Sequence, residues 1–130
     1  MLFVAYHIHS SICLQEAFVK IREQARAYLE MKGELTSGLN LIKNTNLEYF
    51  PVKHKAEIFR LKGDFLLKMN DCENANLAYS NAITLFKHLP KGWISWGNYC
   101  DMVCHALVIA LFFFVHVLRT KLTTVFFTDL

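Results

Sequence analysis

The residues best suited to chemistry in this chain lie close together in its last third. Cys100 and Cys104 are four residues apart, so on a helix both thiols would face one side, with His105 beside them and His116 about three turns further on. Such a group could bind a metal ion. Structural zinc sites, however, use cysteine pairs at shorter spacing and take a second pair from another element, which this sequence does not supply. We therefore expect no metal and no cofactor, and we interpret the cysteines as reduced, buried side chains.

Patterns typical of enzymes do not occur in the sequence. The five glycines do not follow the spacing of a phosphate-binding loop, and neither the catalytic Asp loop nor the metal-binding Asp motif of a kinase is present. Asp64 and Asp71 are explained more simply as a helix-surface charge and a turn residue. His54 and His88 have no nucleophile or carboxylate arranged beside them, so we expect exposed, solvated side chains. The sequence predicts a protein that is not an enzyme.

Length and composition limit what the chain can be. Its 130 residues allow one ordinary domain, and 54% of them are apolar, with the excess concentrated in residues 1–14 and 102–127. The formal net charge of +3 is small, and the basic residues alternate with acidic ones. We therefore expect no direct binding to nucleic acid.

Residues 56–89 have the pattern of a helical hairpin repeat. A bulky residue is followed by a small one four positions later on a first helix, and a small-aromatic-small pattern follows on a second helix. The bulky-small pair recurs at a period of about 34 residues, which is the period of the tetratricopeptide repeat. The residues that we expect to pack the repeats are Phe59, Gly63, Leu66, Ala75, Tyr79, Ala82, Trp93 and Gly97.

The other helices follow from amphipathic spacing. An amphipathic helix is predicted for residues 15–32, ended by Gly33, and a second helix for 34–45. Pro51 opens a third helix over residues 52–69, and Asn70 with Glu73 forms a capping box for a fourth over 71–88. A fifth helix over 93–100 would be the first half of another pair. We predict an all-α fold of tetratricopeptide-like hairpins, an α-solenoid fragment, with a hydrophobic C-terminal helix.

Repeats of this kind bind other proteins along the groove formed by their first helices. In tetratricopeptide geometry Arg60, Asp64 and Asn98 would lie toward that groove. They are candidates for a protein-binding site, and an ordinary solvated face is the alternative.

Four runs of sequence resemble a known family: AYLEMKGELTSGLNLI, NLEYFPVKHKAEIFRLKGDFLLK, NLAYSNAITLFK and LPKGWISWGNYCDM. They are similar to the FAT region in the pseudokinase branch of the phosphatidylinositol-3-kinase-related kinase family. The resemblance implies a nuclear scaffold, without catalytic residues in this region, in histone acetyltransferase co-activator complexes that regulate transcription from chromatin. It also implies three kinds of partner: the other subunits of those complexes, adjoining helical repeats and transcriptional activators.

The resemblance divides the chain into three parts. Residues 15–102 are the FAT-type region, residues 1–14 are a segment outside the family, and residues 103–130 are a hydrophobic tail that departs from it. Residues 102–118 carry no formal charge and would span about 25 Å as a helix, somewhat short of a bilayer core of about 30 Å. Three interpretations of the tail stay open. It is a membrane helix of a small single-pass protein with a cytosolic repeat module, a hydrophobic helix that covers the open end of the repeat stack, or sequence added by a truncated or mis-spliced gene model.

Overall fold

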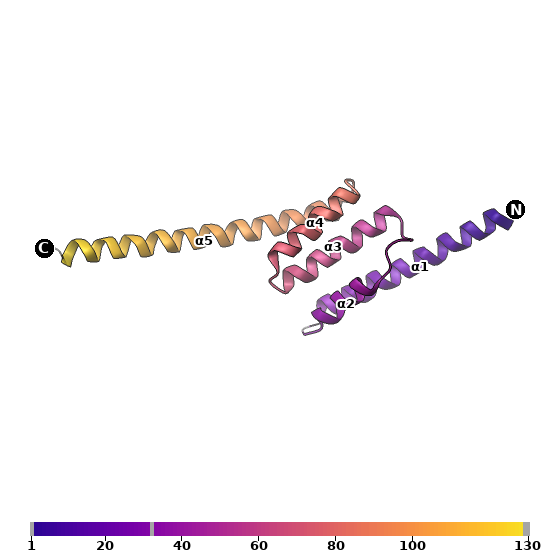
Figure 1. Cartoon of the computed structure of the whole chain (residues 1–130), viewed down its shortest axis with the longest axis horizontal. Helices are drawn as coiled ribbons and strands as arrows, with labels where there is room; N and C mark the ends of the chain where they lie inside the picture. Colours follow the sequence, from indigo (N-terminus) through magenta and orange to yellow (C-terminus); the bar gives the residue numbers. More distant parts are fainter. Residues whose placement is uncertain (1, 32, 129–130) are drawn as a thin grey trace. The chain divides into compact units, whose positions relative to one another are not determined.

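We describe the chain from a computed structural model, which places the backbone of residues 2–31 and 33–128 and the side chains of residues 12–31 and 33–125. These residues form five α-helices and no strand (Figure 1). The helices are α1 (Leu2–Glu30), α2 (Leu35–Asn44), α3 (Val52–Lys68), α4 (Cys72–Leu85) and α5 (Pro90–Thr128). The predicted all-α class, with helical hairpins and a long apolar C-terminal helix, is confirmed.

The chain divides into two compact units, the first ending at Trp96 and the second beginning at Gly97. In the first unit α3 packs most extensively on α4, and the two lie side by side as a hairpin in Figure 1. Helix α1 packs on α2, and both contact α3. Consecutive helices therefore pair as tetratricopeptide-like hairpins, and the pairs stack through α3.

The turn between α3 and α4 corrects the predicted cap. Asn70 has a positive φ of 62°, and its backbone N–H bonds to the carbonyl of Leu67, while that of Asp71 bonds to the carbonyl of Leu66. This is a Schellman motif, in which a left-handed residue ends the helix. Asp71, not Asn70, caps α4, because its carboxylate accepts from the backbone N–H of Asn74 at 3.3 Å.

The first helix begins earlier than predicted. A helix was expected over residues 15–32, whereas α1 runs without a break from Leu2 to Glu30. Residues 2–14 contain no glycine or proline, so nothing in the segment interrupts a helix. The side chains of residues 1–11 and residue Lys32 lie outside the described part. Gly33 follows α1 with a φ of 93°, as expected of a residue that ends a helix.

Two glycines allow aromatic rings to enter the helix contacts of the first unit. A Cβ at Gly38 of α2 would overlap the ring of Phe65 from α3, which is completely buried. A Cβ at Gly63 of α3 would lie 2.6 Å from Cε1 of Tyr79, whose exposure is only 1%. Leu66 is buried beside these contacts. Ala75 and Ala82 of α4, which we also predicted to pack the repeats, are completely buried.

Helix α5 is longer than predicted. It begins at Pro90 and continues to Thr128, because no glycine or proline follows Gly97 to break it. In the described residues the chain therefore does not turn back after Cys100 to complete a third pair. This changes the role of two predicted packing residues. A Cβ at Gly97 would meet no atom within 4 Å, and Trp93 is 52% exposed.

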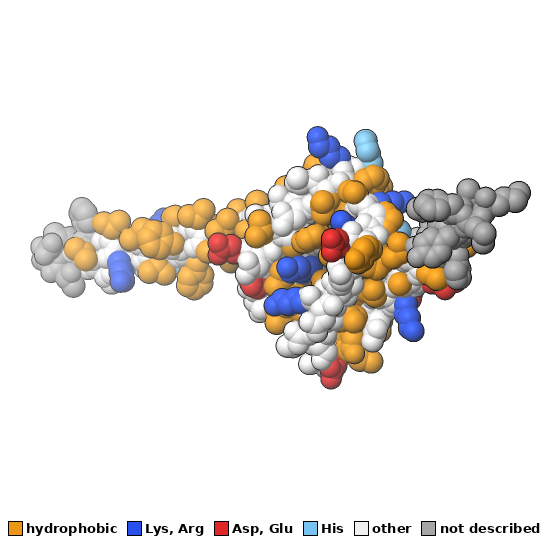
Figure 2. Space-filling model, turned by 45° about the vertical axis from the view of Figure 1, so that its right-hand side comes forward, with side chains coloured by type: hydrophobic (Ala, Val, Ile, Leu, Met, Phe, Trp, Pro, Cys, Tyr) orange, Lys and Arg blue, Asp and Glu red, His pale blue; other side chains and the backbone are white. Residues whose placement is uncertain are grey.

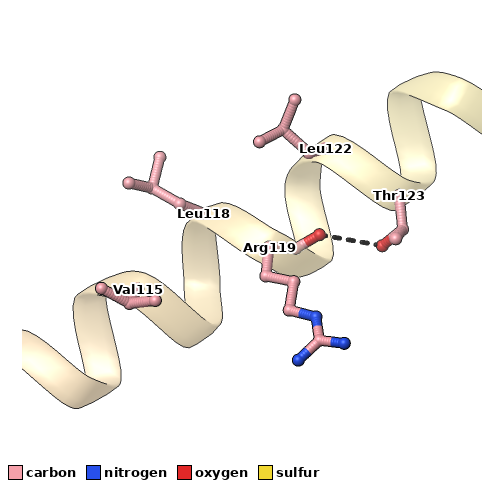
Figure 3. Close-up of a pocket in the computed structure, with 5 residues that line it drawn as sticks. All are labelled: Val115, Leu118, Arg119, Leu122 and Thr123. Carbon is pink, nitrogen blue, oxygen red and sulfur yellow. Dashed lines mark hydrogen bonds between the residues drawn. The ribbon is translucent and has the colours of Figure 1, made fainter.

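The second unit is the remainder of α5, and its described side chains from Cys104 to Val125 are all exposed. Hydrophobic side chains cover most of this helix in the left part of Figure 2. Val115, Leu118 and Leu122 share one helix face and border an open depression (Figure 3). Since no other element contributes to that depression, it offers no enclosed binding site.

Candidate protein-interaction site

An ion-pair network occupies the middle of α3. Glu57, Arg60 and Asp64 are three and four residues apart and so lie on one face of the helix. The Arg60 guanidinium donates to Glu57 Oε1 at 2.7 Å and to Glu57 Oε2 at 3.2 Å, and to Asp64 Oδ2 at 2.9 Å. The Arg60 and Glu57 side chains are only 12% and 10% exposed. Arg60 is therefore held by both carboxylates at once.

Two further helices join this network within the first unit. The Tyr79 hydroxyl of α4 donates to Asp64 Oδ1 at 2.6 Å, and Arg60 also donates to the Ser95 hydroxyl of α5 at 3.4 Å. Both oxygens of Asp64 are thus used, one by its own helix and one by α4. The network links α3 to α4 and to the beginning of α5.

Burial and pairing act in opposite directions on the pKa values of Arg60 and Asp64, and in the same direction on the pKa of Tyr79. Burial alone would lower the pKa of Arg60, but its hydrogen bond to Glu57 and the charges of Glu57 and Asp64 outweigh burial and raise it. Burial raises the pKa of Asp64, and the opposing effects of Tyr79 and Arg60 do not cancel that increase. The pKa of Tyr79 is raised by burial and then by its bond to Asp64. The phenol therefore stays protonated and remains a donor.

A groove runs beside the network, between α1, α3 and the first turn of α5. One hollow of about 380 Å³ is lined by Gln15, Phe18, Arg22, Lys53, His54, Glu57, Leu89, Pro90 and Lys91. A second hollow of about 260 Å³ is lined by Arg22, Arg26, Leu29, Glu57, Arg60, Leu61, Asp64 and Lys91. They share three residues, so we treat them as one surface, the basic groove. Its charged residues are Arg22, Arg26, Lys53, Arg60, Lys91, Glu57 and Asp64.

The first hollow contains a ring stack. The imidazole of His54 lies on the ring of Phe18, with centroids 3.9 Å apart and planes within 5°. Burial, and then the positive charges of Lys53 and Arg22, lower the pKa of His54. Its Nδ1 atom and Arg22 Nε are buried without a hydrogen-bond partner among the described residues. The prediction that His54 is an exposed, solvated side chain is therefore wrong.

The three residues that we predicted to line a protein-binding groove do not lie together. Arg60 and Asp64 line the basic groove, but they are paired to each other rather than free. Asn98 is exposed and belongs to the second unit. Arg22, Arg26 and Lys91 were not predicted, because the first two lie on α1 and Lys91 lies far along the chain at the start of α5. The spacing of Glu57, Arg60 and Asp64 was the signal that could have identified the network.

A second groove lies between α2, α3 and α4. It has a volume of about 510 Å³, and Phe59 and Leu66 line it together with the exposed Leu77. Phe59, which we predicted to pack inside the repeat, is thus half-buried at the edge of this groove. Its ring lies 6.0 Å from the Lys62 ammonium.

The cysteines are free thiols, as predicted, but they are not buried as predicted. Cys13, Cys100 and Cys104 are exposed, and Cys72 is half-buried. They are therefore not core side chains. Among the described residues no group of three His, Cys, Asp or Glu side chains could hold a metal ion.

Comparison with known proteins identifies similar sequences over most of the chain. The FAT domain family matches residues 3–107. The subunit TRA1 of the SAGA and NuA4 acetyltransferase complexes of Saccharomyces cerevisiae is 47% identical over 91 residues, 70% of this chain. Its Schizosaccharomyces pombe counterpart is 45% identical over 93 residues, 72% of the chain. The mouse transformation/transcription domain-associated protein is 35% identical over 124 residues, 87% of the chain.

These relatives are much longer than this chain, which spans only 2% of each yeast protein and 5% of the mouse protein. The family match covers residues 3–107 and so extends beyond both predicted boundaries of the FAT-type region, at residues 14/15 and 102/103. Those two boundaries stay predictions. One described helix, Pro90–Val125, is long and apolar enough to cross a membrane by length and composition. Neither the matched family nor the names of the relatives points to a membrane, so the single-pass interpretation has no support from them.

Proposed function

Because the chain belongs to the FAT domain family, we propose that it is a non-catalytic scaffold segment of a nuclear acetyltransferase co-activator complex that regulates transcription. The observation that carries the proposal is the 47% identity over 91 residues to a named subunit of two such complexes. The helical hairpins suit this role, since repeats of this kind bury their faces against neighbouring repeats and present long surfaces to partners.

The FAT-type region supplies the scaffold in this proposal. Residues 15–102 carry the interaction surfaces, and residues 1–14 and 103–130 flank them. The partners are adjoining helical repeats, other subunits of the complex and transcriptional activators, with no direct contact to nucleic acid. The weak formal charge of +3 agrees with the last point.

The use of the carboxylates supports a non-catalytic role. Asp64 is held by Arg60 and Tyr79, and Asp71 caps α4. Phosphoryl transfer requires Asp side chains that are free to bind metal ions and to orient a nucleophile. In the first unit these two side chains stabilise the fold instead.

A segment exchange tests the proposal. The 91-residue segment of the Saccharomyces cerevisiae subunit that matches this chain is replaced by the corresponding residues of the chain. Complexes are then purified through a tag on another subunit and assayed for acetyltransferase activity. We expect the exchanged subunit to co-purify with an active complex, and the same exchange carrying Gly63→Leu to fail. Loss of assembly with the unaltered segment would overturn the proposal.

A further inference from the structure

The second unit carries a sequence pattern that the scaffold proposal does not use. From Cys104 to Val125, exposed apolar side chains recur alternately four and three residues apart, which is the spacing of the two core positions, a and d, of a coiled coil. We call these side chains the heptad seam. Its a positions are Val108, Val115 and Leu122, and its d positions are Cys104, Leu111, Leu118 and Val125. The second unit therefore presents the core positions of a coiled coil on its surface.

The charged residues of this helix favour a protein partner over a lipid bilayer. Arg119 and Lys121 are the charged residues between Cys104 and Val125, and they occupy the e and g positions that flank a coiled-coil core. A helix that crosses a bilayer needs about 20 consecutive apolar residues, whereas the uncharged run of residues 102–118 ends at Arg119. The heptad seam continues beyond both charges to Leu122 and Val125.

The open depression in Figure 3 has the composition of a coiled-coil hole. In a coiled coil, a core side chain of one helix enters a hole formed by four side chains of the other. Val115, Leu118, Arg119 and Leu122 border the depression, with Thr123 beside them. The first four occupy an a position, the d and e positions that follow it, and the next a position, which are the four positions that surround a d side chain in a parallel pair. The side chain that fills this hole in register is Leu118 of a second copy.

The residue types in the heptad seam favour two parallel strands. Val at a combined with Leu at d is typical of parallel dimers. Here Val108 and Val115 at a alternate with Leu111 and Leu118 at d. In such a pair each core residue meets its own counterpart, so Cys104 at the first d position meets Cys104 of the second copy.

We propose that the second unit binds a second copy of this chain, and that the two helices form a parallel, in-register coiled coil from Cys104 to Val125. The heptad seams of the two copies pack on each other, while Arg119 and Lys121 stay at the edge of the contact in water. The proposal concerns the second unit alone and does not rest on the scaffold function of the FAT-type region.

Disulfide crosslinking of the full chain tests the register. One variant keeps Cys104 as its only cysteine, and the matched control keeps only Cys100, which is also exposed but lies at a g position outside the heptad seam. The other cysteines are changed to Ser, and oxidised glutathione accepts the two electrons and two protons that the thiols release. Because only d-position thiols face each other across the pair, we expect a covalent dimer through Cys104 and mostly monomer with Cys100 on non-reducing gels.

Charge placed in the heptad seam tests the contact itself. Leu111→Lys with Leu118→Lys puts two charges in the core, whereas Ile109→Lys with Val117→Lys puts the same charges on exposed positions outside it. We expect the dissociation constant of the dimer, measured by sedimentation equilibrium, to rise at least about tenfold in the seam variant and less than about twofold in the control. Lys is a good helix former, so circular dichroism should show the same helix content in both variants.

Other kinds of association give different results. Equal crosslinking through Cys100 and Cys104, or equal weakening by the two pairs of Lys substitutions, would show aggregation without a defined seam. A dimer that Cys104 does not crosslink would show antiparallel or shifted pairing. Flotation of the parent chain with phosphatidylcholine vesicles, lost equally with both pairs of Lys substitutions, would show that a bilayer is the partner. Each of these outcomes overturns the proposal.

Discussion

Asp64 shows how tightly individual residues of this network depend on each other. Its two oxygens accept from different helices, Arg60 on its own helix and Tyr79 on α4. Burial nevertheless raises its pKa, so these partners offset the loss of hydration only in part. Removing one of them leaves a buried oxygen without a donor.

Tyr79→Phe therefore tests the network with little change in packing. We expect a loss of about 1–3 kcal/mol in the free energy of unfolding, because the phenol is the donor to Asp64 Oδ1 and the ring stays in place. Urea denaturation followed by circular dichroism measures the loss. Tyr49→Phe is the matched control, since Tyr49 is 71% exposed. Similar midpoints for both variants would contradict the assigned role of the hydroxyl.

His54 makes the stability of the folded chain depend on pH, and the sign of this dependence follows from the surroundings of the imidazole. Its pKa is lowered in the folded chain by burial and by Lys53 and Arg22, so below pH 6.5 the unfolded chain binds the proton more readily. The contribution of His54 is fully present above pH 6.5 and is lost as the pH falls through the folded pKa. Lys91 and Glu57 also line this hollow; the first reinforces the trend and the second opposes it.

We expect the parent chain to lose stability between pH 7 and pH 5 more steeply than the variant His54→Gln. Urea midpoints measured at intervals across that range provide the comparison. His88→Gln serves as the control, because His88 is exposed and lies outside the basic groove. Parallel pH profiles for the parent and His54→Gln would show that another group causes the trend.

At the scale of the helices, small residues set how closely neighbours approach. Gly63→Leu places side-chain atoms where the Tyr79 ring lies 2.6–2.9 Å from an ideal Cβ, so we expect a loss of about 1–3 kcal/mol in the free energy of unfolding. Gly97→Ala is the control within a helix. With no atom within 4 Å it should stabilise the chain by about 0.5–1 kcal/mol. Unfolding midpoints that move together would mean that Gly63 is not a contact residue.

The turn between α3 and α4 depends on one backbone conformation. Asn70 has a φ of 62°. This left-handed conformation costs residues with a Cβ roughly 1–2 kcal/mol, and Asn adopts it more readily than most of them. We expect Asn70→Ala to lower stability by about 1 kcal/mol and Asn70→Gly to leave it unchanged or slightly higher. Thermal melts followed by helical circular dichroism distinguish the two. Identical melts for the Ala and Gly variants would argue against the left-handed cap.

Sequence reasoning succeeded where the signal was local. Gly33 and Pro51 marked helix ends because glycine adopts a positive φ at low cost and proline fixes φ at its own position. The spacing of Gly63 from Phe59 followed the repeat pattern. The hydrophobic C-terminal helix was predicted, but not its continuity with the helix expected over residues 93–100, because the resemblance to the family placed a boundary after residue 102. The basic groove was missed for another reason. Arg22, His54 and Lys91 lie far apart in sequence, and only the folding of the first unit brings them to one hollow.

At the scale of the whole molecule, exposed apolar surface determines behaviour in solution. From Leu107 to Val125 the second unit exposes its large apolar side chains by 38–78%. Monomeric proteins rarely expose contiguous apolar patches larger than a few hundred Å². The first unit exposes fewer such groups, although Trp93 and Ile94 are 52% and 61% exposed.

We therefore expect the full chain to self-associate in water, and a chain that ends at Met102 to associate much less at equal concentration. Sedimentation velocity and light scattering over a concentration series measure both. A full-length chain carrying Val108→Glu, Phe112→Lys and Val115→Glu is the control, because it keeps the length but breaks the apolar surface, and it should behave like the shorter chain. If the shorter chain associates more strongly than the full chain, the prediction is wrong, and the exposed Trp93 and Ile94 become the surface to change next.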